Sequence, residues 1–506
     1  MGLRITLVIG ITLLLSFFCF NSGFCDEKKA IDDNFDSVEA LIDLLREKGI
    51  VSEDEAARFI QRSRKRTVPE AGQQGVITIV PEEYIEKITK DMAREIKKNI
   101  KDEITQETRR LVPGWVNRIR WGGDIRLRYQ GEFYDEQNAD LLKPDKPTEL
   151  MNTRKDRQQL RYRVRLKMKA EVNDKLEFGV RLSTGNETNP VSTNETLGDY
   201  KTGDSIVFDR AYLKWKPIPE ISVWGGRIPN PWFCSDLIWD SDLNFEGIAL
   251  NLDTHIAGPL SGFLTAGAFP LQEKWSQNGK WLYGGQAGLQ LSLWKDPKSK
   301  VPGVTVKMGA AYYDYENIVG KRNDPLQPNE TDWTAPQFQQ KGNTLFDIDP
   351  SSAYKLALAS EYDELNITGI LDIGFFHPVH VVFLADYVKN LGFDQNEVAD
   401  RTGNPDVKKE IEGYQVGLTV GYPKVRKSGE WNTFLFYKHL EADAALDAFT
   451  ESDFHLGGTN AEGWILGGRF GLGENWWLRT RWLTADEIEG PALAIDVLQV
   501  DINAAF

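Results

Sequence analysis

Basic side chains recur at every second residue in several segments. Of all the patterns in the sequence, this one most clearly gathers charged groups that could interact with a solute. In residues 160–170, arginine or lysine alternates with another residue type over the whole segment. Successive side chains of a β-strand point to opposite faces, so this alternation predicts a strand with one basic face and one largely apolar face. The residues that we assign to this basic face, here and in neighbouring segments, are Arg126, Arg128, Arg161, Arg163, Arg165, Lys167, Arg181, Arg210, Lys214 and Arg227.

A wall of cations repels itself, so acidic partners are expected. The best candidates are Asp236, Asp240 and Asp242, which follow the rigid stretch 229–233 (PNPWF). Acidic groups set opposite a basic wall produce a transverse field, and rings of charge set ion selectivity. The alternative is that these charges form structural salt bridges within the wall.

Histidine is common in catalytic sites, but the distribution of histidines in this sequence does not indicate an enzyme. The five histidines are His255, His377, His380, His439 and His455. None joins a recognisable nucleophile motif or zinc-binding helix. The spacing of His377 and His380 suggests a metal pair, but the intervening proline and the expected turn favour a chance pairing. We expect no catalytic residue, no metal and no cofactor.

Composition narrows the class of protein. The chain has 506 residues, a formal net charge of −15 and abundant aromatic residues (11%). The acidic balance argues against a nucleic-acid partner, because nucleic-acid-binding domains carry a basic face. A hydrophilic average (mean hydropathy −0.41) fits a soluble enzyme. It fits a transmembrane β-barrel equally well, because polar inward and apolar outward residues cancel in the average.

The N-terminus predicts export. A positive Arg4 precedes an apolar stretch over 5–20, and a small residue, Gly23, lies three positions before a cleavage point after Cys25. This pattern is typical of a secretory signal peptide over 1–25, and the apolar stretch is short for a membrane anchor. A lipoprotein signal is disfavoured by Phe24. Cleavage leaves Cys234 as the one cysteine, so no intrachain disulfide is expected.

Residues 26–113 predict a small helical region. Its longest helix is expected over 82–112, where apolar residues form one stripe at spacings of three and four. The stripe consists of Ile85, Ile88, Met92, Ile96, Ile100 and Ile104. It has to be buried, either against the preceding short helices, under the following domain, or in a coiled-coil-like bundle with other copies. Isoleucine at core positions favours more than two helices, so a homo-oligomer, a trimer, is predicted.

From residue 114 to 506 the period changes to two, which predicts an all-β antiparallel transmembrane barrel. Connections alternate between short turns and long polar loops, as in outer-membrane barrels, and about sixteen strands fit the pattern. Residues 353–376 could hold one strand or two. Charges on the lipid face cost about 2–4 kcal/mol at the midplane, so the basic face must point inward. The last strand ends at Phe506, which resembles the C-terminal signal that barrel-assembly machinery recognises.

Several motifs resemble the bacterial "putative porin" family. They are 121–129 (WGGDIRLRY), 163–166 (RVRL), 172–185 (VNDKLEFGVRLSTG), 225–232 (GGRIPNPW), 244–249 (NFEGIA) and 386–390 (DYVKN). The stretch 44–56 (LLREKGIVSEDEA) resembles the family's periplasmic extension. The resemblance implies an outer-membrane porin with its N-terminal region in the periplasm. In general diffusion porins the loop at the place of Asp236–Asp242 folds inward as a constriction, so this loop is a candidate constriction.

These observations predict a water-filled channel for passive diffusion of small hydrophilic solutes or ions, in contact with outer-membrane lipids. Two alternatives stay open. One is a structural or adhesive barrel in which the helical region tethers the cell envelope. The other is a more selective anion channel, because the basic face is so dense.

Overall fold

The structure, a computed structural model, describes residues 116–143, 146–198, 200, 202–274, 279–294, 301–349 and 355–506. The predicted signal peptide (1–25), the helical region (26–113) and its long helix (82–112) lie outside these residues, as does the apolar stripe. The expectations about them therefore stay predictions.

Sixteen long strands within the described residues form one antiparallel sheet that closes on itself, which confirms the predicted barrel. The strands are β1 (Ile119–Tyr134), β4 (Arg157–Asn173), β5 (Leu176–Thr184), β7 (Ile206–Trp215), β8 (Ile221–Pro229), β9 (Asn244–Ala257), β10 (Leu260–Gln272), β11 (Lys280–Leu293), β12 (Val304–Glu316), β15 (Asp363–Ile373), β16 (His380–Asn390), β17 (Glu412–Gly421), β18 (Trp431–Leu440), β19 (Ala461–Gly473), β20 (Trp476–Glu487) and β21 (Ala494–Ala505). Most exceed the roughly 9–11 residues that a tilted strand needs to cross a bilayer.

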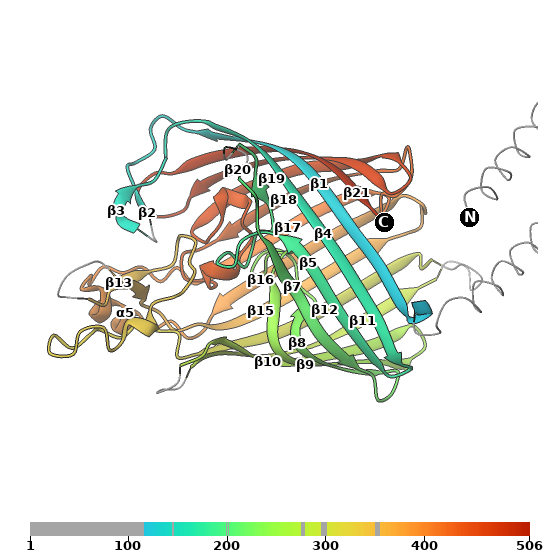
Figure 1. Cartoon of the computed structure of the whole chain (residues 1–506), viewed down its shortest axis with the longest axis horizontal. Helices are drawn as coiled ribbons and strands as arrows, with labels where there is room; N and C mark the ends of the chain where they lie inside the picture. The colour runs from blue at the N-terminus through green and yellow to red at the C-terminus, as the bar shows by residue number, and fades with distance from the viewer. Residues whose placement is uncertain are drawn as a thin grey trace, which may run out of the picture. The chain divides into compact units, whose positions relative to one another are not determined.

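The barrel closes between its first and last strands. β1 pairs with β4 on one side and with β21 on the other, from Asp124 opposite Ala505 to Tyr134 opposite Ile495. The two-residue strand β6 (Glu195–Thr196) continues the pairing of β4 beyond the end of β5. Figure 1 shows the strands running obliquely around the barrel, with the blue β1 beside the red β21. Closure leaves no free sheet edge at this seam.

Alternation along the strands separates an apolar outside from a polar inside. On β1, Leu127 is 51% exposed whereas the adjacent Arg128 is 2% exposed. Exposed Leu, Ile, Val and Met side chains recur on the outward face of strand after strand, as a lipid contact requires. Aromatic residues such as Trp121, Trp215 and Trp476 are exposed near the short-turn ends. None of the helices in the described part of the chain is long and apolar enough to span a membrane.

The connections alternate in length as predicted. Short turns follow β4, β7, β9 and β19, whereas long loops follow β1, β12, β16 and β18. Residues 353–376, which could have held one barrel strand or two, contain one, β15. The residues before it contribute β14 (Leu356–Leu358), which pairs with β13 (Leu345–Asp347) apart from the barrel sheet. In Figure 1 the long loops, including β13, gather at one end of the barrel.

One α-helix occurs in the described residues, α5 (Gln395–Thr402), and the sequence did not predict it. It lies within one of the long polar loops, 391–411. Asp394 caps its N-terminus by accepting hydrogen bonds from the amides of Asn396 and Glu397. Gly403, with φ 71°, ends it. Eight residues are too few for helical periodicity to stand out in a polar segment.

Other short elements decorate the loops. They are β2 (Leu142–Lys143), β3 (Lys146–Leu150) and the 3₁₀ turns η1 (Val116–Arg118), η2 (Asp332–Thr334), η3 (Asp447–Phe449) and η4 (Phe454–Leu456).

Phe506 lies at the seam of the barrel. Its amide donates to the carbonyl of Gly123 at 3.0 Å, and the amide of Gly123 donates back to the carbonyl of Phe506 at 3.2 Å. The terminal residue thus extends the β1–β21 pairing. Its recognition by assembly machinery remains a prediction.

Candidate functional site

The predicted basic wall lies on four adjacent strands, β1, β4, β5 and β7. Arg126 lies opposite Arg163, and Arg128 lies opposite Arg161, so the side chains stack in rows across the sheet. Strand parity and burial turn these residues toward the interior. The residues that the structure places on this inward face are Arg126, Arg128, Arg161, Arg163, Arg165, Lys167, Arg181, Arg210 and Lys214.

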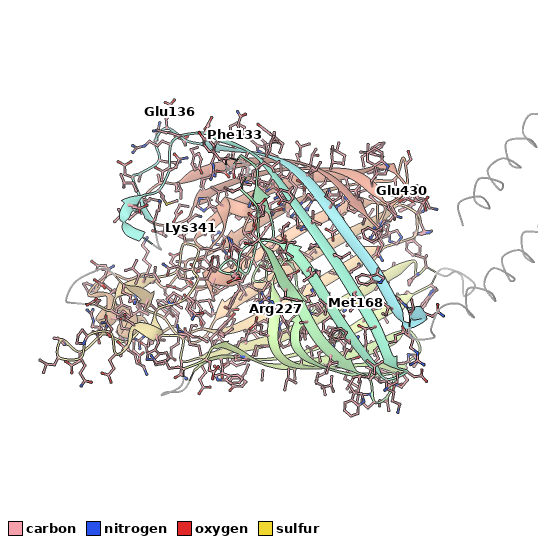
Figure 2. The ribbon with its side chains drawn as sticks, in the orientation of Figure 1. Phe133, Glu136, Met168, Arg227, Lys341 and Glu430 are labelled. Atoms are coloured by element: carbon pink, nitrogen blue, oxygen red, sulfur yellow. The ribbon has the colours of Figure 1, made fainter. Side chains whose placement is uncertain are left out.

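The prediction that Arg227 belongs to this wall is wrong. On β8 it shares the face of Ile221 and Val223, which is the outward one. Figure 2 labels the position of Arg227. Its guanidinium lies 2.7 Å from the Glu246 carboxylate, and both side chains are exposed. Arg227 and Ala211 form the last pair between β7 and β8 toward the long loops. A paired outward charge costs less near the end of a strand than at the bilayer midplane.

Three further arginines extend the wall, and the sequence analysis missed them. Arg469 on β19 lies opposite Arg479 on β20, and Arg481 follows two residues later on the same inward face. β20 pairs with β21, which pairs with β1, so these arginines continue the wall across the seam. The signal was present, because Arg479 and Arg481 have the same spacing as Arg126 and Arg128.

Asp242, in the loop 230–243, is the predicted acidic residue that reaches the basic wall. Its carboxylate lies 3.3 Å from Arg163 and 3.1 Å from Arg165, and these two arginines also bind Asp124 at 3.0 Å. Burial by itself raises the pKa of Asp242, but Arg163 and Arg165 outweigh burial and hold that pKa below its ordinary value. Thr193 donates a further hydrogen bond at 3.1 Å.

The other two predicted aspartates do not touch the arginines. Asp240 accepts hydrogen bonds from the amides of Asp242 (2.7 Å) and Ser452 (2.9 Å), which ties its loop to the loop 441–460. Burial, reinforced by the neighbouring Asp242 carboxylate, raises the pKa of Asp240. Asp236 accepts from the Gln415 side chain at 2.7 Å, on the opposite side of the loop. Of the three predicted aspartates, Asp242 therefore contacts the basic wall, whereas Asp236 and Asp240 do not.

A second loop supplies acids that the sequence analysis did not anticipate. In the loop 441–460, Asp453 lies 3.0 Å from Arg128 and also contacts Arg481 and Gln499. Glu451 lies 2.9 Å from Arg481. Burial raises the pKa of Asp453, but Arg128 and Arg481 outweigh it, so that pKa lies well below its ordinary value. Two inward-folded loops therefore contact the same arginine wall.

An aromatic cluster holds the inward loops in place. Trp239 from the loop 230–243 is 2% exposed, and its ring centre lies 5.2 Å from that of Tyr313 on β12. Trp232 packs on the same Tyr313 ring at 5.1 Å, and Phe449 from the loop 441–460 lies 6.0 Å from Trp239. Burial of apolar surface stabilises this cluster by about 25 cal/mol per Å². These ring contacts hold both loops against the inner wall at β12.

The interior is therefore electrically asymmetric. Arginines cover one arc of the wall, from β19 through the seam to β7, and carboxylates on two loops face them. Charges separated across a low-dielectric enclosure produce a strong local field. Such a field orients dipolar solutes and attracts one sign of ion.

The histidine pair forms a local contact at the short-turn end. The rings of His377 and His380 lie 3.2 Å apart between nitrogens, and His380 also lies 2.7 Å from Asp372. Within the described ranges, no cluster of three or more His, Cys, Asp or Glu side chains has the geometry to hold a metal ion.

One family model and several solved structures are similar to this chain. The family model described as "Putative porin" matches residues 36–506. Among solved structures, the chain is similar to the outer membrane channel DcaP of Acinetobacter baumannii, with 10% identity, a TM-score of 0.40 and coverage of 77% of this chain and 97% of that one. It is also similar to OprB of Pseudomonas putida (13%, TM-score 0.42, 77% and 94%) and OpdL of Pseudomonas aeruginosa (11%, TM-score 0.37, 77% and 98%). No curated protein matches.

The likenesses to solved structures have TM-scores below 0.5 and support no conclusion about this chain. The family match is different, because it covers nearly the whole chain. The described strands form the closed barrel with an apolar exterior that an outer-membrane channel requires. The chain therefore belongs to the "Putative porin" family of outer-membrane β-barrel channels.

Proposed function

We propose that the chain forms a water-filled channel, and not an enzyme, through which small hydrophilic solutes and ions diffuse passively with a preference for anions. The observation that carries the proposal is the inward arginine arc that runs from β19 to β7. In this proposal the inward basic residues line the pore, and the loop 230–243 with Asp242 narrows it.

The balance of charge on this arc supports the preference for anions. Its ten arginines are Arg126, Arg128, Arg161, Arg163, Arg165, Arg181, Arg210, Arg469, Arg479 and Arg481. Among the residues that the structure describes, the carboxylates within 4 Å of them are Asp124, Asp209, Asp242, Glu451, Asp453 and Asp501. Ten cations against six anions leave a positive excess, which raises the local concentration of anions.

Planar-bilayer recording of the purified, full-length mature protein tests this function. We expect discrete conductance steps, and a zero-current potential in a KCl gradient that has the sign of chloride preference. A folded barrel, identified by its shifted gel mobility before boiling, that gives no conductance would contradict the channel. That outcome would favour the structural or adhesive alternative.

The N-terminal region is proposed to lie in the periplasm and to hold a trimer. Deleting 26–112 is expected to leave a conducting barrel, because closure of the sheet satisfies its own backbone. It is expected to weaken the oligomer, because the stripe of Ile85 to Ile104 would bury apolar area between helices at about 25 cal/mol per Å². Size-exclusion chromatography with light scattering in mild detergent measures the change. An unchanged oligomer would assign the stripe to another partner.

A further inference from the structure

A patch of donors on four adjacent strands stands apart from the rest of the arginine arc. We call it the seam patch: Arg469 on β19, Arg479 on β20, Asn503 on β21 and Arg126 on β1. Arg469 lies directly opposite Arg479, and Asn503 lies directly opposite Arg126. In the register of β20 and β21, Arg479 lies opposite Asp501, which is two residues before Asn503 on the same face. The four side chains therefore surround one area of the inner wall.

Several polar atoms of the seam patch have no partner. Among the described residues, no acceptor lies within hydrogen-bonding distance of Arg126 Nε, Arg479 Nε or Asn503 Nδ2. Arg126 is 6% exposed and Asn503 is 7% exposed, so both are more than nine-tenths buried. Buried donors are almost always paired, and an unpaired one costs about 1–3 kcal/mol. Arg126 donates to Asn194 Oδ1 from its Nη2 at 2.7 Å, so the unpaired donors of Arg479 and Asn503, on neighbouring strands, are the ones that indicate a place built for an acceptor-rich ligand.

The charges of the seam patch also indicate an anionic ligand. Within the part of the chain that the structure describes, Arg469 and Arg479 have no carboxylate within 4 Å, although like charges directly opposite each other on a sheet are destabilising. The nearby Asp501 is occupied by Arg128, which binds both carboxylate oxygens at 2.7 and 3.1 Å. Arg126 reaches Asp501 only at 4.0 Å. By contrast, Arg163 and Arg165 each have two carboxylates.

The seam patch is accessible to a solute in the barrel. Arg469 and Arg479 are both partly exposed, whereas Arg126 and Asn503 are buried. Asn475 lies in the short turn between β19 and β20, and Arg479 follows it by four residues on β20. Arg469 and Arg479 are the partly exposed members of the patch, so a ligand that enters from that end meets them first.

We propose that the seam patch is a binding site for a small oxyanion, a carboxylate or a phosphate, during passage through the barrel. This inference rests on the proposed channel function. Guanidinium groups present planar N–H donors that match the paired oxygens of these anions, and the amide of Asn503 adds a donor of fixed direction. Chloride lacks such paired oxygens, so the site distinguishes oxyanions from chloride.

Block of chloride current tests the site. The full-length protein is recorded in KCl at constant ionic strength while potassium succinate or, separately, potassium phosphate is added. We expect a saturable fall in current, and the salt with the lower half-blocking concentration identifies the preferred oxyanion. Arg479→Gln removes a charge-assisted partner and is expected to raise the half-blocking concentration about tenfold or more.

Arg210→Gln is the matched control, because it removes the same charge from the same inner wall on β7. Arg210 has its own acceptor, Asn244 Oδ1 at 2.7 Å, and we expect it to leave the half-blocking concentration within a factor of about two of the original. Asn503→Leu, which keeps the side-chain volume but removes the donor, is a second probe of the seam patch that leaves the charge unchanged. Shifted gel mobility before boiling verifies that each variant has folded.

Two results would overturn the site. One is a conducting, anion-preferring channel that neither succinate nor phosphate blocks, which leaves the proposed function intact. The other is an equal rise in the half-blocking concentration for Arg479→Gln and Arg210→Gln, with none for Asn503→Leu. That result would mean that the summed charge of the wall, and not a site, attracts the anion.

Discussion

Replacing both Arg163 and Arg165 with glutamate is expected to turn the preference of the channel from anions to cations. These two side chains are the ones that meet Asp124 and Asp242 at about 3 Å. The double replacement converts a neutral cluster of two cations and two anions into four neighbouring carboxylates. We expect the chloride-to-potassium permeability ratio to fall about tenfold, because fixed charge in an enclosed site changes local ion concentration by that order.

The zero-current potential in a KCl gradient measures this ratio. Arg227→Glu is the control, because it reverses a charge on the outward face of β8 and should leave the potential unchanged. Preserved conductance with an unshifted potential in the double variant would place Arg163 and Arg165 outside the conduction path. In that case the ion pairs would have a purely structural role.

Asp453→Ala is expected to have the largest effect on stability. Asp453 is the carboxylate that contacts both Arg128 and Arg481, and these arginines are 2% and 5% exposed. Arg128 keeps Asp501 and Arg481 keeps Glu451, so the substitution removes the acceptor that the two arginines share and costs about 1–3 kcal/mol. We expect a lower temperature for loss of the folded gel band, and noisier, larger currents as the loop 441–460 loosens.

Asp406→Ala provides the comparison, because Asp406 is exposed in another long loop, 391–411. It should change neither the transition temperature nor the current. The depressed pKa of Asp453 gives a second check with a definite sign. Its contribution to stability is present above the unfolded pKa of about 3.9 and is lost as pH falls toward the lower folded value. Stability equal to the parent protein at neutral pH would disprove the role of Asp453 as a link.

The barrel could be predicted because its constraints are local. Each strand from β1 to β21 repeats the same two-residue alternation, and each connection is short or long according to its end of the barrel. In a strand such as 160–170, the apolar and basic positions are fixed by geometry alone. The residues facing inward on β1, β4, β5 and β7 followed directly from that period.

Arg227 shows where this reasoning went wrong. It was assigned to the interior because it is charged, although its parity with Ile221 and Val223 already placed it outside. The two glycines at 225 and 226 hide the alternation, because they mark neither face. Charge is a weaker guide than parity near the end of a strand, where an ion pair with Glu246 keeps the charge acceptable.

The loops could not be predicted in the same way. Asp453 contacts Arg128 across 325 residues of sequence, and no local pattern specifies such a contact. The burial of Trp239 against Tyr313 and Phe449 depends equally on the closed barrel around it. Tertiary packing, and not periodicity, decides which loops fold inward.

The seam between β1 and β21 imposes an order on biogenesis. Arg128 acquires its bidentate partner, Asp501, only when the last strand docks on the first, 373 residues later in the chain. Until then Arg128 of the nascent β1–β4 hairpin lacks this acid, whereas Arg163 and Arg165 can already pair with Asp124 of the same hairpin. Contacts of such long sequence separation form slowly, since loop-closure entropy must be overcome before they contribute. The ion pair of Arg128 with Asp501 therefore stabilises the barrel only after β21 has paired with β1.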